Sequence, residues 1–176
     1  MICETERLII RKLIPEDFAA IHAMMRKPEV MYAWEHGFTE RDTEAWFTVQ
    51  FKRYEEDGCG YFAVALKDTQ TVIGQAGILK YELDGKTDFA IGYIFDDHYW
   101  NKGYATESAK ACIDFAFQQL GAAEIYCEMR PENQPSVKVA ERLGMARIGE
   151  HVKTYRGKEM PHYIYILKRD SSCLTQ

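Results

Sequence analysis

Apolar residues recur along this chain at two different spacings, and each spacing predicts a different kind of element. The segment 8–13 is short and partly alternating, which predicts a strand. From Pro15 to Pro28 the apolar positions return every three or four residues, as on one face of a helix, and a proline fits the first turn because no N–H is needed there. A second helix is predicted over 39–58, with Thr39 as its N-cap and an acidic residue three positions later.

Beyond residue 58 the pattern changes to strands, and then strands alternate with helices. The next predicted strands are 61–66, 72–79 and 89–95. The last of these is nearly all apolar, as is typical of a central strand covered on both faces. The elements predicted after it are a helix over 105–120, a strand over 124–129, a helix over 135–143, and strands over 145–152 and 163–167. The order β-α-α-β-β-β-α-β-α-β-β predicts an α/β (α+β) fold with a mixed sheet flanked by helices.

Length and charge narrow the class of protein. The chain has 176 residues, which predicts one domain over 1–170 followed by a polar tail over 171–176. The net charge of −5 argues against a basic surface for nucleic acid. Five cysteines without a C-x-x-C pair indicate free thiols in a reducing compartment. With no signal peptide and no run of about 18 apolar residues, we expect a cytoplasmic protein without membrane contact. Cys173 has the position of a prenylated cysteine, but the polar Thr175 favours an unmodified tail.

The first candidate site is the junction between the apolar strand and the next helix. A polar loop over 96–102 follows the strand, and small residues, Gly103 and Ala105, stand where the helix begins. The N–H groups of a helix start can bind a diphosphate, Gly103 lets the backbone approach it, and Lys102 adds a positive charge. An ordinary strand-to-helix turn would explain the same residues. Neither of the commoner glycine-rich phosphate motifs occurs in the sequence.

Two separated motifs carry a family resemblance. The first is Ile91-Gly92-Tyr93 followed by residues 99–107, where the pattern Gln/Arg-x-x-Gly-x-Gly/Ala is met except that Trp100 replaces its first residue. The second is formed by residues 133–136 and 140–145. Together with the opening residues, these segments resemble GCN5-related N-acetyltransferases, most closely the branch that acetylates the N-termini of ribosomal proteins. The resemblance spans roughly residues 5–168, nearly the whole chain.

The resemblance implies a centrally splayed sheet and acetyl-CoA as the donor, with no metal. The strand edge at Ile94 and Phe95 would pair with the pantetheine arm. The pyrophosphate would be held by backbone N–H groups of Asn101, Lys102, Gly103, Tyr104, Ala105 and Thr106. Asn133 would contact the pantetheine and Ser136 would lie near the thioester sulfur, although both residue types also favour helix starts, so that capping is the alternative.

The mechanism implied by the resemblance is direct transfer. An amine attacks the thioester, a tetrahedral oxyanion forms, and CoA thiolate leaves. A backbone N–H on the strand from Tyr93 to Phe95 would stabilise the oxyanion, and Ser136 would stabilise the thiolate. An α-amine has a reference pKa of about 8 and a lysine side chain one of about 10.4, so the α-amine needs less activation.

The general base of the branch is missing from this chain. The branch often has Glu directly before the Ile-Gly-Tyr triplet, and here that residue is Ala90. Glu35 is a candidate to touch the acceptor, because it lies between the first two helices, where the family builds its acceptor wall. Asp88 and Glu107 are substitutes by residue type only, and Glu107 favours the helix N-terminus.

The other candidate sites have simpler explanations. Residues Asp96-Asp97-His98 are metal-ligand types, but we do not expect adjacent residues to converge on one ion, and we expect no metal. Cys112 and Cys127 are expected to be core residues. The sequence therefore predicts an acetyl-CoA-dependent N-acetyltransferase acting on a protein N-terminal α-amine. The alternatives are an enzyme for a small amine (a polyamine, amino acid or aminoglycoside) and a non-catalytic acyl-CoA-binding module. Homodimers are common in the family, but no interface is identifiable from the sequence.

Overall fold

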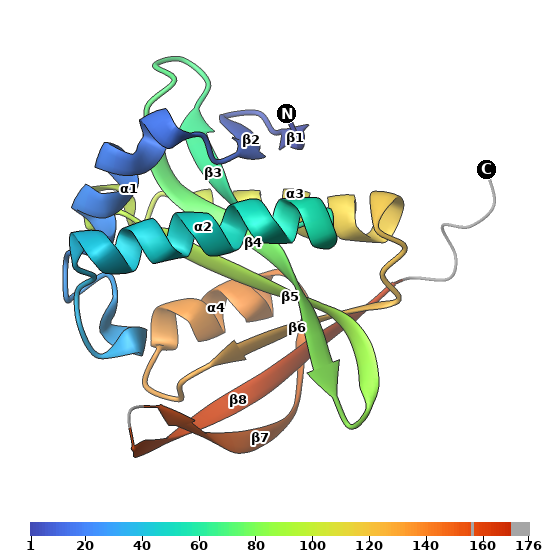
Figure 1. The fold of residues 1–176 in the computed structure, drawn as a ribbon. Helices are drawn as coiled ribbons and strands as arrows, with labels where there is room; N and C mark the ends of the chain where they lie inside the picture. Colours follow the sequence, from blue (N-terminus) through green and yellow to red (C-terminus); the bar gives the residue numbers. More distant parts are fainter. Residues whose placement is uncertain (156, 170–176) are drawn as a thin grey trace.

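The computed structural model describes residues 1–155 and 157–169. In this part of the chain eight strands form one sheet in the order β1-β2-β3-β4-β5-β6-β8-β7. The strands are β1 (Cys3–Glu4), β2 (Leu8–Lys12), β3 (Tyr61–Leu66), β4 (Val72–Leu83), β5 (Lys86–Phe95), β6 (Glu124–Met129), β7 (Ala146–Tyr155) and β8 (Lys158–Lys168). The helices are α1 (Phe18–Met25), α2 (Glu40–Glu56), α3 (Tyr104–Gln119) and α4 (Gln134–Arg142). Helix α2 crosses in front of the strands and α3 runs behind them (Figure 1). The expected tail, including Cys173, lies outside the described residues.

The predicted fold class and element order are confirmed, with one additional short strand, β1. Helix α2 begins as predicted, since the Thr39 hydroxyl accepts a hydrogen bond from the Asp42 N–H at 3.2 Å and the Asp42 carboxylate accepts one from the Thr39 N–H at 2.9 Å. The helix predicted from Pro15 divides into a 3-10 turn (Pro15–Asp17) and α1, which ends at Met25 before Pro28.

Four strands are longer than their apolar runs predicted. Strands β4 and β5 extend to a tight hairpin in which Asp84 and Gly85 have φ of 51° and 77°. Strands β7 and β8 likewise extend toward their own connection. Most of the extra residues are polar and exposed, although Leu83 and the buried Met160 are apolar, so the chain continues to pair beyond its continuous apolar runs.

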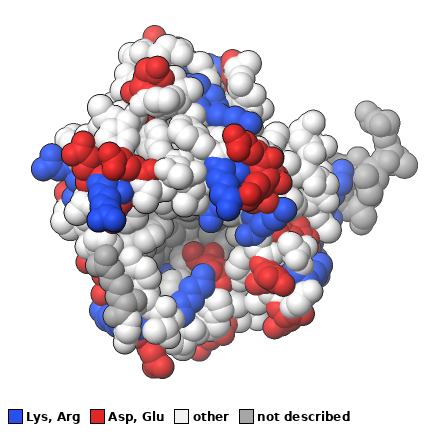
Figure 2. Space-filling view, viewed as in Figure 1, with Lys and Arg blue, Asp and Glu red and all other residues white. Residues whose placement is uncertain are grey.

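The sheet is splayed between β5 and β6. These parallel strands pair only at Phe89 with Ile125 and at Ala90 with Tyr126, and then diverge. At the centre of β5, beside this opening, Gly92 and Tyr93 are only partly buried, whereas Ile91, Ile94 and Phe95 are buried. On the face shown in Figure 2 the surface is hollowed below helix α2, and both acidic and basic side chains lie at the hollow. None of the helices in the described residues is long and apolar enough to cross a membrane.

Candidate active site

Strand β5 has an unpaired edge where it parts from β6. The Asp96 N–H donates to the Ile73 C=O at 3.1 Å, which sets the phase of the β4–β5 ladder. Because hydrogen-bonded and non-hydrogen-bonded positions alternate in an antiparallel pair, the main-chain groups of Ile94 face β4, whereas those of Tyr93 and Phe95 face the gap. An extended ligand can therefore pair with Tyr93 and Phe95, while Ile94 contributes a buried side chain.

Trp100 fastens the following loop to this edge. Its indole N–H donates to the Phe95 C=O at 2.8 Å, and the ring itself is exposed. This bond uses one of the edge groups within the chain, which leaves the Phe95 N–H and the main-chain groups of Tyr93 facing the gap. The residue that departs from the family pattern thus has a structural role at the end of the strand.

The loop and the first turn of α3 present a row of unpaired N–H groups. Asn101 and Gly103 have φ of 60° and 83°, so the chain turns sharply before the helix. The first helical hydrogen bond runs from the Glu107 N–H to the Gly103 C=O at 3.0 Å. The N–H groups of residues 104–106 precede this bond and have no acceptor within the described residues. Together with the exposed Lys102, they form an arrangement suited to a diphosphate.

Arg7 braces this loop from a distant part of the chain, which sequence reasoning missed. Its Nη1 donates to the Lys102 C=O at 3.0 Å and its Nε to the Glu107 carboxylate at 2.7 Å. The guanidinium lies over the Tyr104 ring, 4.6 Å from the centroid. No spacing rule marks an arginine beside a first strand, so only its place in the opening motif could have drawn attention to it.

Glu107 ties the start of β2 to the first turn of α3. Besides Arg7, its carboxylate accepts a hydrogen bond from the Thr5 hydroxyl at 2.5 Å. Burial raises the pKa of Glu107, but the hydrogen bonds from Thr5 and Arg7 outweigh burial and leave the pKa below its usual value. The carboxylate is therefore ionised and engaged, which excludes it as a base for an amine.

Helix α4 brings Ser136 to the same gap. The Tyr93 hydroxyl donates to the Ser136 C=O at 3.2 Å, which joins β5 to α4. The Asn133 side chain accepts from the Ser136 N–H at 3.1 Å, so Asn133 does cap this helix. The Ser136 side chain also interacts with the Tyr93 hydroxyl and lies beside the gap, where it can serve a ligand. Cys127 is buried nearby, and burial raises its pKa to about 12, as fits a core thiol.

Glu35 lies in the loop between α1 and α2 and is neutralised by two cations. Its carboxylate is 2.8 Å from Arg130 Nη1 and 2.9 Å from Lys158 Nζ. The hydrogen bonds from Lys158 and Arg130 lower the pKa of Glu35. A carboxylate held this way is a poor base, but it links the loop to the end of β6 and to the β7–β8 hairpin.

A second carboxylate on this side of the sheet, Glu128, was not predicted. It lies on β6, accepts a hydrogen bond from the Tyr81 hydroxyl at 2.6 Å, and pairs with Lys153 and His151. Burial raises the pKa of Glu128, but the hydrogen bonds from Lys153 and Tyr81 outweigh burial and leave the pKa lowered. Ala90 lies on the same face, packed beside Tyr126. Strand β6 carries two glutamates, Glu124 at its start and Glu128 near its end, and a carboxylate following the apolar run 125–127 is the signal that could have marked Glu128.

Comparison with known proteins decides the family. The family model of the acetyltransferase (GNAT) domain matches residues 7–146. The chain belongs to the GNAT acetyltransferase family. A relative from Bacillus subtilis (strain 168), named as the uncharacterized N-acetyltransferase YnaD, is 34% identical over 146 residues, which cover 82% of each chain.

Solved structures of GNAT proteins share the fold along nearly the whole chain. A GNAT acetyltransferase from Bacillus anthracis is 31% identical with a TM-score of 0.79, and the match covers 94% of this chain and 96% of that one. Two more distant structures show the fold alone. Ribosomal-protein-S5-alanine acetyltransferase from Vibrio fischeri is 21% identical with a TM-score of 0.78, covering 96% and 97% of the two chains. Spermidine N-acetyltransferase from Vibrio cholerae, in complex with CoA and spermine, is 18% identical with a TM-score of 0.76, covering 93% and 96%.

One expectation about this acetyltransferase was based on a wrong premise. Adjacent residues Asp96, Asp97 and His98 do converge, with one possible ligand atom of each within 4.8 Å of the others. They converge because Asp97 begins a short 3-10 turn (Asp97–Tyr99) in which the Asp96 side chain accepts from the His98 N–H at 3.0 Å.

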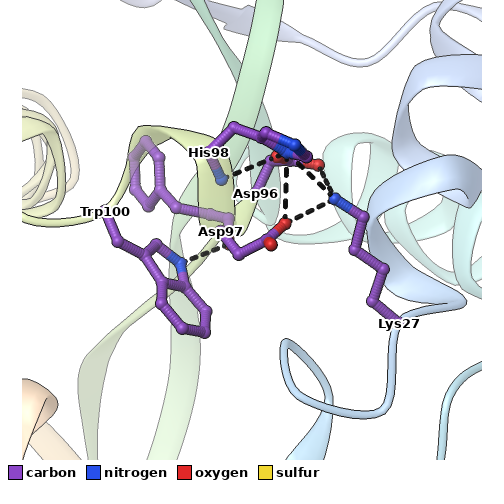
Figure 3. A network of polar contacts seen from close by, with 6 residues as sticks. Lys27, Asp96, Asp97, His98 and Trp100 are labelled. Carbon is purple, nitrogen blue, oxygen red and sulfur yellow. Dashed lines mark hydrogen bonds and ion pairs between the residues drawn. The ribbon is translucent and has the colours of Figure 1, made fainter.

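The group around which they converge is an ammonium of the chain itself. Figure 3 shows Lys27 reaching from the end of α1 to the two aspartates, with Nζ 2.8 Å from Asp96 and 2.5 Å from Asp97. Lys27 Nζ is also 3.3 Å from His98 Nδ1. The lysine supplies the positive charge that these carboxylates need, so this cluster joins α1 to the end of β5.

Proposed function

We propose that this GNAT protein binds acetyl-CoA along the open edge of β5 and transfers the acetyl group to the α-amine of a polypeptide N-terminus. The unpaired main-chain edge at Tyr93 and Phe95, continued by the unpaired N–H groups of residues 104–106, carries the donor half of the proposal. The first set matches an extended pantetheine arm and the second a diphosphate. The free thiols of the described cysteines fit a cytoplasmic enzyme.

The residues of the gap divide the chemistry among them. The amine nitrogen attacks the thioester carbon, and the negative charge that develops on oxygen is stabilised by a β5 N–H, from Tyr93 or Phe95. The tetrahedral intermediate then collapses as the carbon–sulfur bond breaks. The Ser136 hydroxyl, beside that of Tyr93, donates a hydrogen bond to the departing thiolate, while the amine proton passes to solvent.

Charge pairing on the acceptor side favours an α-amine over a polyamine. Glu35 is paired with Arg130 and Lys158, and Glu128 is paired with Lys153 and accepts a hydrogen bond from Tyr81. Neither carboxylate is left to bind the additional ammonium groups that a polyamine carries. An α-amine also suits the absence of a carboxylate at Ala90, because with a reference pKa of about 8 it is partly neutral without a strong base.

Thiol release tests the proposal. The protein is mixed with acetyl-CoA and, in separate reactions, N-terminal peptides, polyamines, amino acids and aminoglycosides, while CoA binding is followed by calorimetry. Peptide-dependent thiol release is expected. Thiol release only with a small amine would identify a small molecule, and not a peptide, as the acceptor. CoA binding without turnover on any amine would favour a non-catalytic binding module.

A glycine pair supplies the control for the donor site. Gly103→Glu places a carboxylate where the diphosphate is proposed to bind and is expected to abolish CoA binding. Gly85→Glu is the matched control, since Gly85 has a similar positive φ of 77° but lies in the β4–β5 hairpin with no atom near its added Cβ. Both changes carry the same backbone strain, so equal CoA affinity in the two variants would refute the diphosphate assignment.

A further inference from the structure

One row across the sheet holds a tyrosine and two glycines. Tyr61 on β3 is opposite Gly77 on β4, and Gly77 is opposite Gly92 on β5. Because residues opposite one another share a face, the Tyr61 side chain lies on the same face as both glycines. The row ends at Gly92, on the last strand before the sheet splays.

The glycines leave the space that Tyr61 fills. A Cβ added to Gly92 would be 2.1 Å from the Tyr61 hydroxyl oxygen and 2.7 Å from Cζ of the ring. A Cβ added to Gly77 would be 2.5 Å from the Tyr61 Cα. The phenol therefore extends across β4 to β5, and its hydroxyl lies against Gly92 at the gap.

Tyr61 is held rigidly in this position. Its N–H donates to the Gln50 side chain at 2.9 Å, and its C=O accepts a hydrogen bond from the Tyr54 hydroxyl. Its ring packs against Trp46 at a centroid distance of 4.8 Å, and the Trp46 indole donates to Gln75 at 2.9 Å. Helix α2 thus fixes both the main chain and the ring of Tyr61.

The Tyr61 hydroxyl has no partner of its own. The residue is only 7% exposed, yet its hydroxyl makes no hydrogen bond anywhere in residues 1–155 and 157–169. The hydroxyl oxygen is not among the fully buried polar atoms that lack a partner, so it keeps some accessible surface through which a ligand can reach it. A rigid phenol without a partner, directed at the open end of a sheet, is typical of a group that binds a ligand.

The two faces of β5 assign this hydroxyl to the acceptor side. Side chains alternate between the two faces along a strand. The Tyr93 side chain, which contacts Ser136, therefore lies on the face opposite to the one on which Gly92 meets Tyr61. A thioester lying along the edge would have Ser136 on one face and Tyr61 on the other.

We propose that the Tyr61 hydroxyl binds the acceptor amine and orients the lone pair of the amine nitrogen toward the thioester carbon. This inference rests on the acetyltransferase function proposed above. The phenol oxygen accepts one N–H of the neutral amine and takes no proton from it, so the proton balance of the transfer is unchanged. Burial raises the pKa of Tyr61, which keeps the phenol protonated throughout.

Tyr61→Phe removes the hydroxyl and keeps the ring that packs on Trp46. We expect unchanged CoA affinity by calorimetry, an unchanged or higher Tm, and a loss of kcat/KM for the amine of about tenfold to a hundredfold. Tyr126→Phe is the matched control, because Tyr126 is a similarly buried tyrosine of this sheet whose hydroxyl donates to Glu124 instead. Its kcat/KM is expected to equal that of the unmodified protein.

The outcomes separate this inference from the function on which it rests. If the protein acetylates an amine and Tyr61→Phe does so equally well, the role of Tyr61 is refuted and the transferase stands. If kcat/KM, CoA affinity and Tm all fall together, Tyr61 is a packing residue and the inference is again wrong. If the unmodified protein binds CoA but neither binds nor acetylates any amine of the panel, the transferase proposal fails, and the Tyr61 role with it.

Discussion

Replacing Arg7 with methionine should weaken CoA binding far more than it weakens the fold. The side chain is 45% exposed, and its hydrogen bonds and ring contact are with the loop and the first turn of α3: the Lys102 C=O, the Glu107 carboxylate and the Tyr104 ring. Methionine keeps an unbranched apolar stem but none of these polar contacts. The variant therefore releases the diphosphate loop from β2 and leaves Glu107 without its cation.

The expected magnitude follows from the exposure of this pair. A solvent-exposed ion pair contributes about 0.2–1 kcal/mol, and Glu107 is less exposed than Arg7, at 19%, so we expect the free energy of unfolding to fall by about 1 kcal/mol. The effect on CoA is larger because an unpaired carboxylate in the first helical turn repels a diphosphate. A loss of about 1.4 kcal/mol in binding corresponds to a tenfold weaker affinity for CoA.

Arg11→Met provides the contrasting control. Arg11 donates two hydrogen bonds to Asp17, whose side chain is only 5% exposed, so its loss leaves a buried carboxylate unpaired. The Arg11 variant should lose more stability than the Arg7 variant and bind CoA normally. Both variants are measured by urea unfolding and by calorimetry with CoA and with pantetheine, which lacks the diphosphate. Equal losses for CoA and pantetheine in Arg7→Met would refute the reasoning.

Four further measurements test individual elements. Thr39→Ala removes the N-cap of α2 and should lower the free energy of unfolding by about 1 kcal/mol in urea titration, with CoA affinity unchanged. Gly77→Ala places a Cβ 2.3 Å from the Gly60 C=O, a main-chain atom that cannot rotate away, and should lower stability by about 1–3 kcal/mol or more. Cys127 is buried with a pKa raised to about 12, so mass spectrometry should find it unalkylated by iodoacetamide at mildly alkaline pH until the protein unfolds. The pKa of Glu107 is lower in the folded state than in the unfolded state. The ionised carboxylate therefore stabilises the fold above the unfolded pKa, and this stabilisation is lost as the pH falls through the folded pKa. Glu107→Gln should flatten that acidic part of a curve of unfolding free energy against pH.

Periodicity predicted the elements that have a clean apolar face. Strands 61–66 and 124–129 were predicted with the bounds that the structure shows, and α2 begins at the predicted cap. The missed parts lack such a signal. Strand β1 is two residues long. The outer part of β4 has only Tyr81 and Leu83 as apolar residues among polar ones, too short a run to mark a strand, so its pairing with β5 in the folded chain is what reveals it.

The parts of the candidate site that could be predicted from the sequence are those formed by residues close together in the chain. The N–H row at 104–106 follows from a helix start, and the Asn133 cap follows from a residue type at a helix start, so both could be inferred from short segments. Arg7 reaches Glu107 across 100 residues of sequence, and no pattern within one segment indicates that contact. The Lys27 ion pairs fall into the same class, which is why Asp96 and Asp97 suggested a metal cluster on paper.

The missing carboxylate at Ala90 can be understood from the other charges near the gap. Glu35 and Glu128 are both ionised and paired with cations of the chain, so restoring a third carboxylate at residue 90 would place a negative charge among groups that are already balanced. A site arranged in this way offers the acceptor amine no free carboxylate that could act as a strong base. Its contribution to the transfer is orientation of the amine. Orientation alone is sufficient only for an acceptor that reaches the site partly neutral, and among biological primary amines the α-amine, with its reference pKa of about 8, meets that condition far better than the lysine side chain. Ala90→Glu therefore separates two explanations of the gap. If orientation is what limits the transfer, the added carboxylate should leave kcat/KM for a peptide α-amine unchanged; a large increase would show that a base is what the site lacks.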